Sequence, residues 1–128
     1  MNIGLLEDNP AIVDYMSIAL EMVGHKVHLH TYASSLLETI FTSPRIPSSL
    51  PYDIVIVDIL LPGAISGEQA IDHILQAIQP QTLPIIIISA AAEEVLEQIK
   101  ERLPHIPILR KPFKMNMLLQ LMDVMKTE

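Results

Sequence analysis

Short runs of apolar residues alternate along the chain with longer segments in which apolar residues recur every three or four positions. A short apolar run is typical of a buried strand, and the longer spacing is typical of a helix with one buried face. The expected strands are Asn2–Leu6, Lys26–Thr31, Asp53–Val57, Leu83–Ser89 and Ile106–Leu109. The expected helices are Ala11–Val23, Ser34–Thr42, Gly67–Ile78, Ala92–Leu103 and Phe113–Lys126. Five repeats of strand and helix predict an α/β fold with a parallel sheet, in a single domain over residues 1–128.

The apolar content of each expected strand predicts its place in the sheet. The first, third and fourth strands are almost continuously apolar, as expected where helices cover both faces. The second alternates polar and apolar residues from His25 to His30. Pro107 stands inside the fifth, and only an edge strand tolerates its missing N–H. With the second and fifth strands at the edges, the expected order is 2-1-3-4-5, that of a flavodoxin-like (βα)5 three-layer sandwich.

The connections carry local signals of their own. Asn9 is a good N-cap with Pro10 at the first helical position, where a missing N–H costs nothing. Ser66 followed by Gln69 has the pattern of a capping box. The segment Ser43–Tyr52 is rich in proline and serine, and we expect it to be a surface loop.

Five polar residues stand at the carboxyl ends of four expected strands. They are Glu7 and Asp8 after the first, Asp58 after the third, Ser89 at the end of the fourth and Lys111 after the fifth. In an open parallel sheet these ends form one rim, where ligands bind. Crowded carboxylates repel one another unless a cation joins them, and oxygen ligands with room for water suit Mg²⁺. Each residue alone would be explained as well by a helix cap, a turn or a solvated side chain, but together they predict a site for a hard divalent cation.

Composition excludes several classes of function. Eight Lys and Arg against fifteen Asp and Glu give a net charge of -7, which argues against direct binding to nucleic acid or anionic lipid. The absence of cysteine excludes disulfides and thiolate chemistry. The most apolar run, Pro84–Ala92, is too short to span a bilayer, and the residues after Met1 lack the pattern of a signal peptide. We therefore expect a cytoplasmic protein without a membrane segment.

Four segments resemble, in order and spacing, the motifs of response-regulator receiver domains: Leu5–Asp8, Val55–Pro62, Ile88–Ala90 and Lys111–Phe113. The resemblance covers essentially the whole chain. It implies a two-component signalling protein rather than a metabolic enzyme, in which a sensor histidine kinase or a phosphotransfer protein phosphorylates Asp58.

The same resemblance implies a role for each residue of the rim. Glu7, Asp8, Asp58 and the backbone carbonyl of Leu60 would hold Mg²⁺. Ser89, Ala90 and Lys111 would bind the phosphoryl group, and the surface near the fourth and fifth helices would then shift.

One departure from the family pattern keeps a second interpretation open. Ile108 stands where the family has an aromatic switch residue, so any switch must work differently here. The alternative is a phosphate-independent pseudo-receiver that acts as a docking or dimerisation module, although the intact acids argue against it. A flavin carrier on the same fold is disfavoured, because the acidic segment Glu7–Pro10 would repel a phosphate.

Two further features bear on partners. On the last helix, Met117, Leu121 and Val124 widen the apolar arc beyond one packing face, which predicts either a covering homodimer or effector domain, or simply deep packing. His28 and His30 share one face of the second strand. A weak metal pair is conceivable there, but a solvated edge is the expected interpretation.

Overall fold

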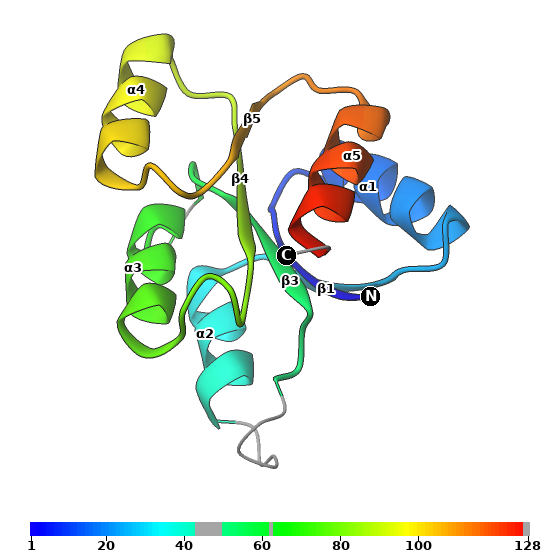
Figure 1. The fold of residues 1–128 in the computed structure, drawn as a ribbon, viewed down its shortest axis with the longest axis horizontal. Helices are drawn as coiled ribbons and strands as arrows, with labels where there is room; N and C mark the ends of the chain where they lie inside the picture. The colour runs from blue at the N-terminus through cyan, green and yellow to red at the C-terminus, as the bar shows by residue number, and fades with distance from the viewer. Residues whose placement is uncertain (43–49, 62, 127–128) are drawn as a thin grey trace.

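The structure is a computed structural model that describes residues 1–42, 50–61 and 63–126. Within these residues, five parallel strands form one sheet in the order β2-β1-β3-β4-β5 (Figure 1). The strands are β1 (Asn2–Leu6), β2 (Lys26–His30), β3 (Ile54–Asp58), β4 (Ile85–Ser89) and β5 (Ile108–Arg110). The helices are α1 (Pro10–Met22), α2 (Ala33–Thr42), α3 (Gly67–Ala77), α4 (Glu93–Arg102) and α5 (Met115–Lys126). The predicted fold class and strand order are confirmed.

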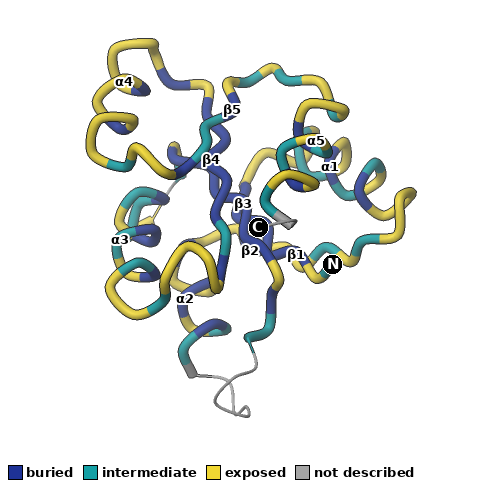
Figure 2. Tube along the Cα trace, in the orientation of Figure 1, coloured by how far each residue is buried: buried dark blue, intermediate teal, exposed yellow. Residues whose placement is uncertain are grey.

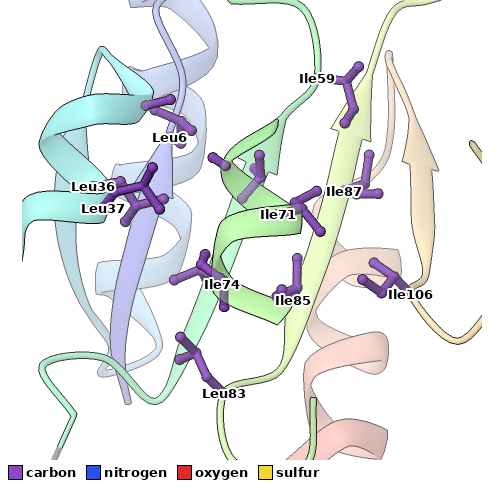
Figure 3. Packing of buried hydrophobic residues seen from close by; sticks show 14 of the residues in the cluster. Leu6, Leu36, Leu37, Ile59, Ile71, Ile74, Leu83, Ile85, Ile87 and Ile106 are labelled. Carbon is purple, nitrogen blue, oxygen red and sulfur yellow. The ribbon is translucent and has the colours of Figure 1, made fainter. Parts of the chain in front are cut away.

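The sheet is the middle of three layers. Helices α2, α3 and α4 cover one face, and α1 and α5 cover the other (Figure 1). Successive residues of β3 face opposite layers, so Ile56 belongs to the core under α1 and α5, and Val57 belongs to the core under α2 and α3. Figure 3 shows Ile71 and Ile74 of α3 packed against the sheet in this second core. Because both faces are covered, every residue of β3 and β4 is buried (Figure 2).

Two predicted helix starts are confirmed in atomic detail. The side chain of Asn9 accepts hydrogen bonds from the amides of Ala11 and Ile12, and Pro10 opens α1. At the start of α3, the Gln69 amide donates to Ser66 Oγ at 3.1 Å, and the Ser66 amide donates to Gln69 Oε1 at 2.9 Å. These bonds fix where α1 and α3 begin, directly after the loops that follow β1 and β3.

Several predicted boundaries were wrong, and proline explains two of them. The fifth strand begins at Ile108, and Pro107 precedes the strand rather than lying inside it. The Pro107 carbonyl accepts a hydrogen bond from Ile87 at 2.9 Å, but proline has no amide with which to continue a ladder. The fourth strand begins at Ile85, directly after Pro84, rather than at Leu83.

The last helix also starts later than predicted, at Met115 instead of Phe113. Phe113 belongs to the connection, where its carbonyl accepts a hydrogen bond from the Tyr15 hydroxyl and its ring lies against the ring of Tyr15. Pro112 is therefore separated from the helix by two residues.

The expectation of a solvated histidine edge was wrong for His30. His28 is exposed, but His30 is buried, with its ring nitrogens 2.7 Å from Ser35 Oγ and 2.5 Å from the Tyr52 hydroxyl. Tyr52 was predicted to lie in a surface loop, yet it is buried over Gly4 of β1, where a Cβ atom would come within 2.7 Å of the ring. Leu50 and Pro51 of the predicted surface loop lie outside any helix or strand, and residues 43–49 lie outside the described residues.

Helix α4 is held by two buried side chains and by exposed ion pairs at its two ends. Only Leu96 and Ile99 are buried among its residues, and Ala92 caps its start without a side-chain hydrogen bond. At the start, Glu93 pairs with Arg110 of β5. At the end, Arg102 pairs with two carboxylates of α3, those of Glu68 and Asp72. All of these charged side chains are well exposed, so each pair contributes little free energy on its own.

Across the described part of the chain, no helix combines the length and the apolar character needed to cross a membrane.

Candidate functional site

Glu7 stands directly after β1 and is completely buried. Its amide donates to the carbonyl of His30 in β2 at 3.0 Å, which extends the sheet by one bond beyond the strand. Its Oε2 accepts the amides of Asp8 and Asn9, each at 3.1 Å, and its Oε1 accepts Lys111 Nζ at 2.7 Å. Both carboxylate oxygens therefore have partners, and the loop that enters α1 folds around them.

Asp58 is the last residue of β3, and its side chain is only 4% exposed. Its Oδ1 accepts the Leu60 amide at 3.1 Å, and its Oδ2 accepts Lys111 Nζ at 3.2 Å. Gly67, the first residue of α3, lies directly against the backbone of Asp58: a Cβ atom at this glycine would come within 2.2 Å of the Asp58 carbonyl oxygen. Because residue 67 is glycine, the start of α3 can pack directly against the backbone of Asp58.

Lys111 brings a positive charge from the fifth strand to these acids. Its amide donates to the carbonyl of Ser89 at 2.8 Å, and this bond continues the pairing of β4 with β5. Its side chain is 14% exposed and reaches Glu7 and Asp58 together. One ammonium therefore joins two buried carboxylates that come from different strands.

Ser89 ends β4 on the same rim. Its side chain is fully buried, and its Oγ accepts the amide of Ala91 at 3.0 Å. Because the oxygen is the acceptor in this bond, the O–H hydrogen remains available for another acceptor. Ala90, between these two residues, is exposed.

Three carboxylates gather closely enough to share a cation. Oxygens of Glu7, Asp8 and Asp58 lie within 4.8 Å of one another, and among the residues described no other such cluster was found. Glu7 and Asp58 are buried, whereas Asp8 is exposed and leaves one side open to water. Oxygen donors with room for water match the preference of Mg²⁺, so these residues fit a hard divalent cation.

The electrostatics of the cluster favour binding of positive charge. Burial raises the pKa of Asp58 to about 6, and the nearby Glu7 carboxylate raises it as well, while the Leu60 amide and Lys111 oppose the shift. Burial lowers the pKa of Lys111, but its hydrogen bond to Glu7 and the charges of Asp58 and Glu7 outweigh burial, so that its pKa lies above the ordinary value. Lys111 stays charged, yet one ammonium does not balance two buried carboxylates and a third beside them.

The structure brings together the five polar residues that the sequence placed on one rim, and it adds details that the sequence did not reveal. Leu60 reaches the site through its backbone, since its amide bonds Asp58 while its side chain is exposed. Ile108 is half-buried and packs against the core under α2, α3 and α4.

The close approach of Gly67 to Asp58 was not predicted. The only sequence signal for it was the choice of glycine, a poor helix former, in the first turn of a helix.

An open α/β sheet with this arrangement of acids, hydroxyl and lysine at its carboxyl rim defines a class of phosphoryl-accepting domains, and comparison with known proteins names the family. The model of the response regulator receiver domain matches residues 3–123. The chain belongs to this family, whose members are phospho-acceptor signalling modules of two-component systems that interact with histidine kinases or phosphotransfer proteins.

Solved structures of the same fold include domains from several signalling proteins. The receiver domain of a sensor histidine kinase from Pseudomonas aeruginosa PAO1, with a magnesium ion coordinated in its active-site cleft, is 23% identical with a TM-score of 0.81, over 99% of this chain and 98% of that one. A sensor protein from Polaromonas sp. JS666 is 25% identical with a TM-score of 0.77, over 98% and 96% of the two chains. The Vibrio cholerae chemotaxis protein CheY4 is 18% identical with a TM-score of 0.77, over 97% of both chains.

Proposed function

We propose that this receiver is an active phospho-acceptor: Asp58 takes a phosphoryl group from a sensor histidine kinase or a phosphotransfer protein in a reaction that depends on Mg²⁺. The observation that carries the proposal is the position of Lys111, whose ammonium contacts both Glu7 and Asp58 inside a cluster of three carboxylates. Glu7, Asp8, Asp58 and the backbone carbonyl of Leu60 would hold the metal ion.

The reaction asks for position and charge rather than for covalent assistance. A carboxylate oxygen of Asp58 forms a bond to phosphorus while the bond from phosphorus to the donor histidine nitrogen breaks, and that nitrogen keeps the electron pair. Lys111 lies 3.2 Å from Asp58 Oδ2 and places positive charge beside the incoming group. Mg²⁺, when bound, supplies further positive charge to the phosphoryl oxygens. The Leu60 amide holds the other oxygen of Asp58 and so orients the carboxylate.

Phosphorylation adds a charge of about -1.5 to -2 and three strong acceptor oxygens beside Asp58. Ser89 would donate its hydroxyl hydrogen to one of these oxygens, Ala90 would approach with the same loop, and Lys111 would turn from Glu7 toward the new charge. Because Ser89 and Lys111 stand at the ends of β4 and β5, their movement would shift the surface near α4 and α5.

Ile108 favours a second candidate function, a phosphate-independent docking or dimerisation module. With isoleucine at the position where receivers carry an aromatic, this chain has no aromatic ring there to respond to Ser89. The intact cluster of acids and lysine is the reason why we place this candidate second.

Intact mass spectrometry tests the choice. The chain is incubated with acetyl phosphate, with and without Mg²⁺, beside the Asp58→Asn variant as the matched control. We expect a gain of one phosphoryl group only in the presence of Mg²⁺, and none in the variant. No gain in a chain shown to be folded by circular dichroism would support the docking module, and a gain that persists in the variant would place the phosphoryl group elsewhere.

A further inference from the structure

The start of α4 is weakly held. Ala92 precedes the helix and makes no side-chain cap hydrogen bond, whereas a capping serine, threonine, aspartate or asparagine contributes about 1 kcal/mol. Among the described residues, the ion pair at this end joins Glu93 to Arg110 of β5. Both side chains are more than half exposed, so water and salt screen their charges. Little therefore opposes a movement of the first turn of α4 away from the edge strand β5.

The end of α4 is held more firmly, by Arg102. Its Nε donates to Glu68 of α3 at 2.9 Å, and its Nη1 donates to Asp72 of the same helix at 2.8 Å. A guanidinium that bonds two carboxylates at once is fixed in direction, and such a network is stronger than a single exposed pair. Directly after the helix, Leu103 packs against the core under α2, α3 and α4, and its amide donates to the Ile99 carbonyl at 2.7 Å. Charge and apolar packing therefore attach this end together.

Helix α3 is a firm support for the contact with Arg102. Its four buried residues belong to the core, and its capping box fixes the residue at which it begins. Glu68 stands directly after Gly67, which lies against the backbone of Asp58. Arg102 thus ties the end of α4 to the part of α3 that packs behind Asp58, and Figure 1 shows the two helices next to each other on one face of the sheet.

The loop that enters α4 is joined to Ser89. Three alanines, residues 90–92, separate Ser89 from the first residue of the helix, and the Ala91 amide donates to Ser89 Oγ at 3.0 Å. A movement of the Ser89 hydroxyl therefore reaches the start of α4 through a short loop. At position 108 the chain has an isoleucine, which offers no aromatic ring to respond to Ser89.

We propose that α4 rotates about its C-terminal end: Arg102 on α3 is the pivot, and the first turn, from Glu93, is the part that leaves β5. This rotation breaks one exposed ion pair, whereas rotation about the start would break three hydrogen bonds of Arg102. The difference between the two ends exists without phosphorylation, so the pivot does not depend on the phospho-acceptor function. Only its use by a phosphoryl group on Asp58, acting through Ser89, rests on that proposed function.

Amide hydrogen exchange, followed by NMR in the unphosphorylated chain, tests the pivot. The reporters are the Leu96 amide, which donates to the Ala92 carbonyl at 3.1 Å in the first turn, and the Leu103 amide at the end. After correction for intrinsic exchange rates, we expect Leu103 to be protected about three- to tenfold more than Leu96, since extra ion pairs hold its end. Equal protection of the two amides would overturn the proposal.

Two variants separate the ends, and circular dichroism verifies that both fold. Arg102→Gln removes the pivot, and we expect the protection of Leu103 to fall by about three- to tenfold while that of Leu96 is unchanged. Glu93→Gln is the matched control at the other end and should lower the protection of Leu96 alone. A fall at both amides in Arg102→Gln would mean that α4 opens as one unit, and no fall at Leu103 would mean that Arg102 does not hold the end. Either result overturns the pivot.

The same amides, measured with acetyl phosphate and Mg²⁺, test how a phosphoryl group uses the pivot, and intact mass gives the phosphorylated fraction. In the phosphorylated native chain we expect faster exchange at Leu96 and unchanged exchange at Leu103, and in phosphorylated Arg102→Gln faster exchange at both. A phosphorylated native chain with unchanged Leu96, or with both amides faster, refutes this use. A chain that gains no phosphoryl group refutes the phospho-acceptor function instead, and the exchange of the unphosphorylated chain still decides the pivot.

Discussion

At the scale of single residues, the sharing of one ammonium by Glu7 and Asp58 determines the charge of the acid site. Glu7 has two further amide partners, whereas Asp58 has one, from Leu60. Burial raises the pKa of Asp58 to about 6, and the nearby Glu7 carboxylate contributes to this rise. Keeping the buried Asp58 carboxylate ionised beside Glu7 costs free energy. A bound cation offsets this repulsion, and for that reason the site favours positive charge.

The Asp58→Asn variant should be more stable than the native chain at pH 7. The pKa of Asp58 rises from 3.8 to about 6 on folding, so the folded state holds its proton more tightly and loses stability as the pH rises through this window. Asparagine keeps the shape and removes the charge, and we expect a gain of about 1 to 3 kcal/mol in the free energy of unfolding at pH 7.

Urea denaturation at a series of pH values measures this gain, which should shrink toward pH 4, where the native carboxyl is protonated in the folded state. An Asp53→Asn variant, at a solvent-exposed aspartate directly before the start of the same strand, serves as the comparison. A variant at position 58 that is less stable than the native chain at pH 7 would show that the charge of Asp58 is favourable.

At the scale of the elements, the order of the strands followed from sequence because burial on both faces leaves a continuous apolar run. The grouping of the five polar residues was also predictable from the sequence, because the carboxyl ends of parallel strands lie at one edge of the sheet. The errors lie where the sequence pattern was ambiguous. His30 was predicted to be solvated because polar residues alternate in β2. Its ring is instead buried, with hydrogen bonds to Ser35 and Tyr52, and the Tyr52 partner lies 22 residues away, too far along the chain to leave a local pattern.

The first residue of α3 is expected to be intolerant of any side chain. Alanine is favoured over glycine inside a helix by about 1 kcal/mol, but a Cβ atom at position 67 would come within 2.2 Å of the Asp58 carbonyl oxygen, which must then move. We expect Gly67→Ala to lower the free energy of unfolding by about 1 to 3 kcal/mol and to slow phosphorylation of Asp58 by acetyl phosphate.

Gly24→Ala provides the contrast for this prediction. Gly24 has a positive φ of 95° but nothing within 4 Å of an added Cβ, so the substitution strains the backbone without displacing a neighbour. Its phosphorylation rate should match that of the native chain. Equal rates for both variants would mean that α3 does not position Asp58.

At the scale of the whole molecule, a buried polar link ties the edge of the sheet to its central strands. His30 joins β2 to Ser35 of α2 and to Tyr52, whose ring covers Gly4 of β1. Burial lowers the pKa of His30, and the neighbouring His28 lowers it further. The folded state therefore prefers the neutral ring, which can accept one hydrogen bond and donate another.

Because of His30, the free energy of unfolding should fall as the pH is lowered. A histidine whose pKa is lowered on folding binds its proton more readily in the unfolded chain, so its contribution is complete above about pH 6.5 and is lost as the pH falls below that value. We expect a His30→Gln variant to show a weaker loss of stability between pH 7 and pH 5 than the native chain, measured by thermal unfolding. His105→Gln, at an exposed position, is the control. A His30→Gln curve that runs parallel to the native curve would mean that folding leaves the pKa of His30 unchanged.

The attachment of α4 has a consequence for how ionic strength acts on this protein. Only two buried side chains hold the helix to the sheet, and the remaining attachments are exposed ion pairs at its two ends. Dissolved salt screens exposed charges while leaving buried apolar contacts intact. Raising the salt concentration therefore weakens the attachment of both ends of α4, while Leu96 and Ile99 continue to anchor the helix to the sheet. Among the helices, α4 is the one whose ends we expect to respond to ionic strength.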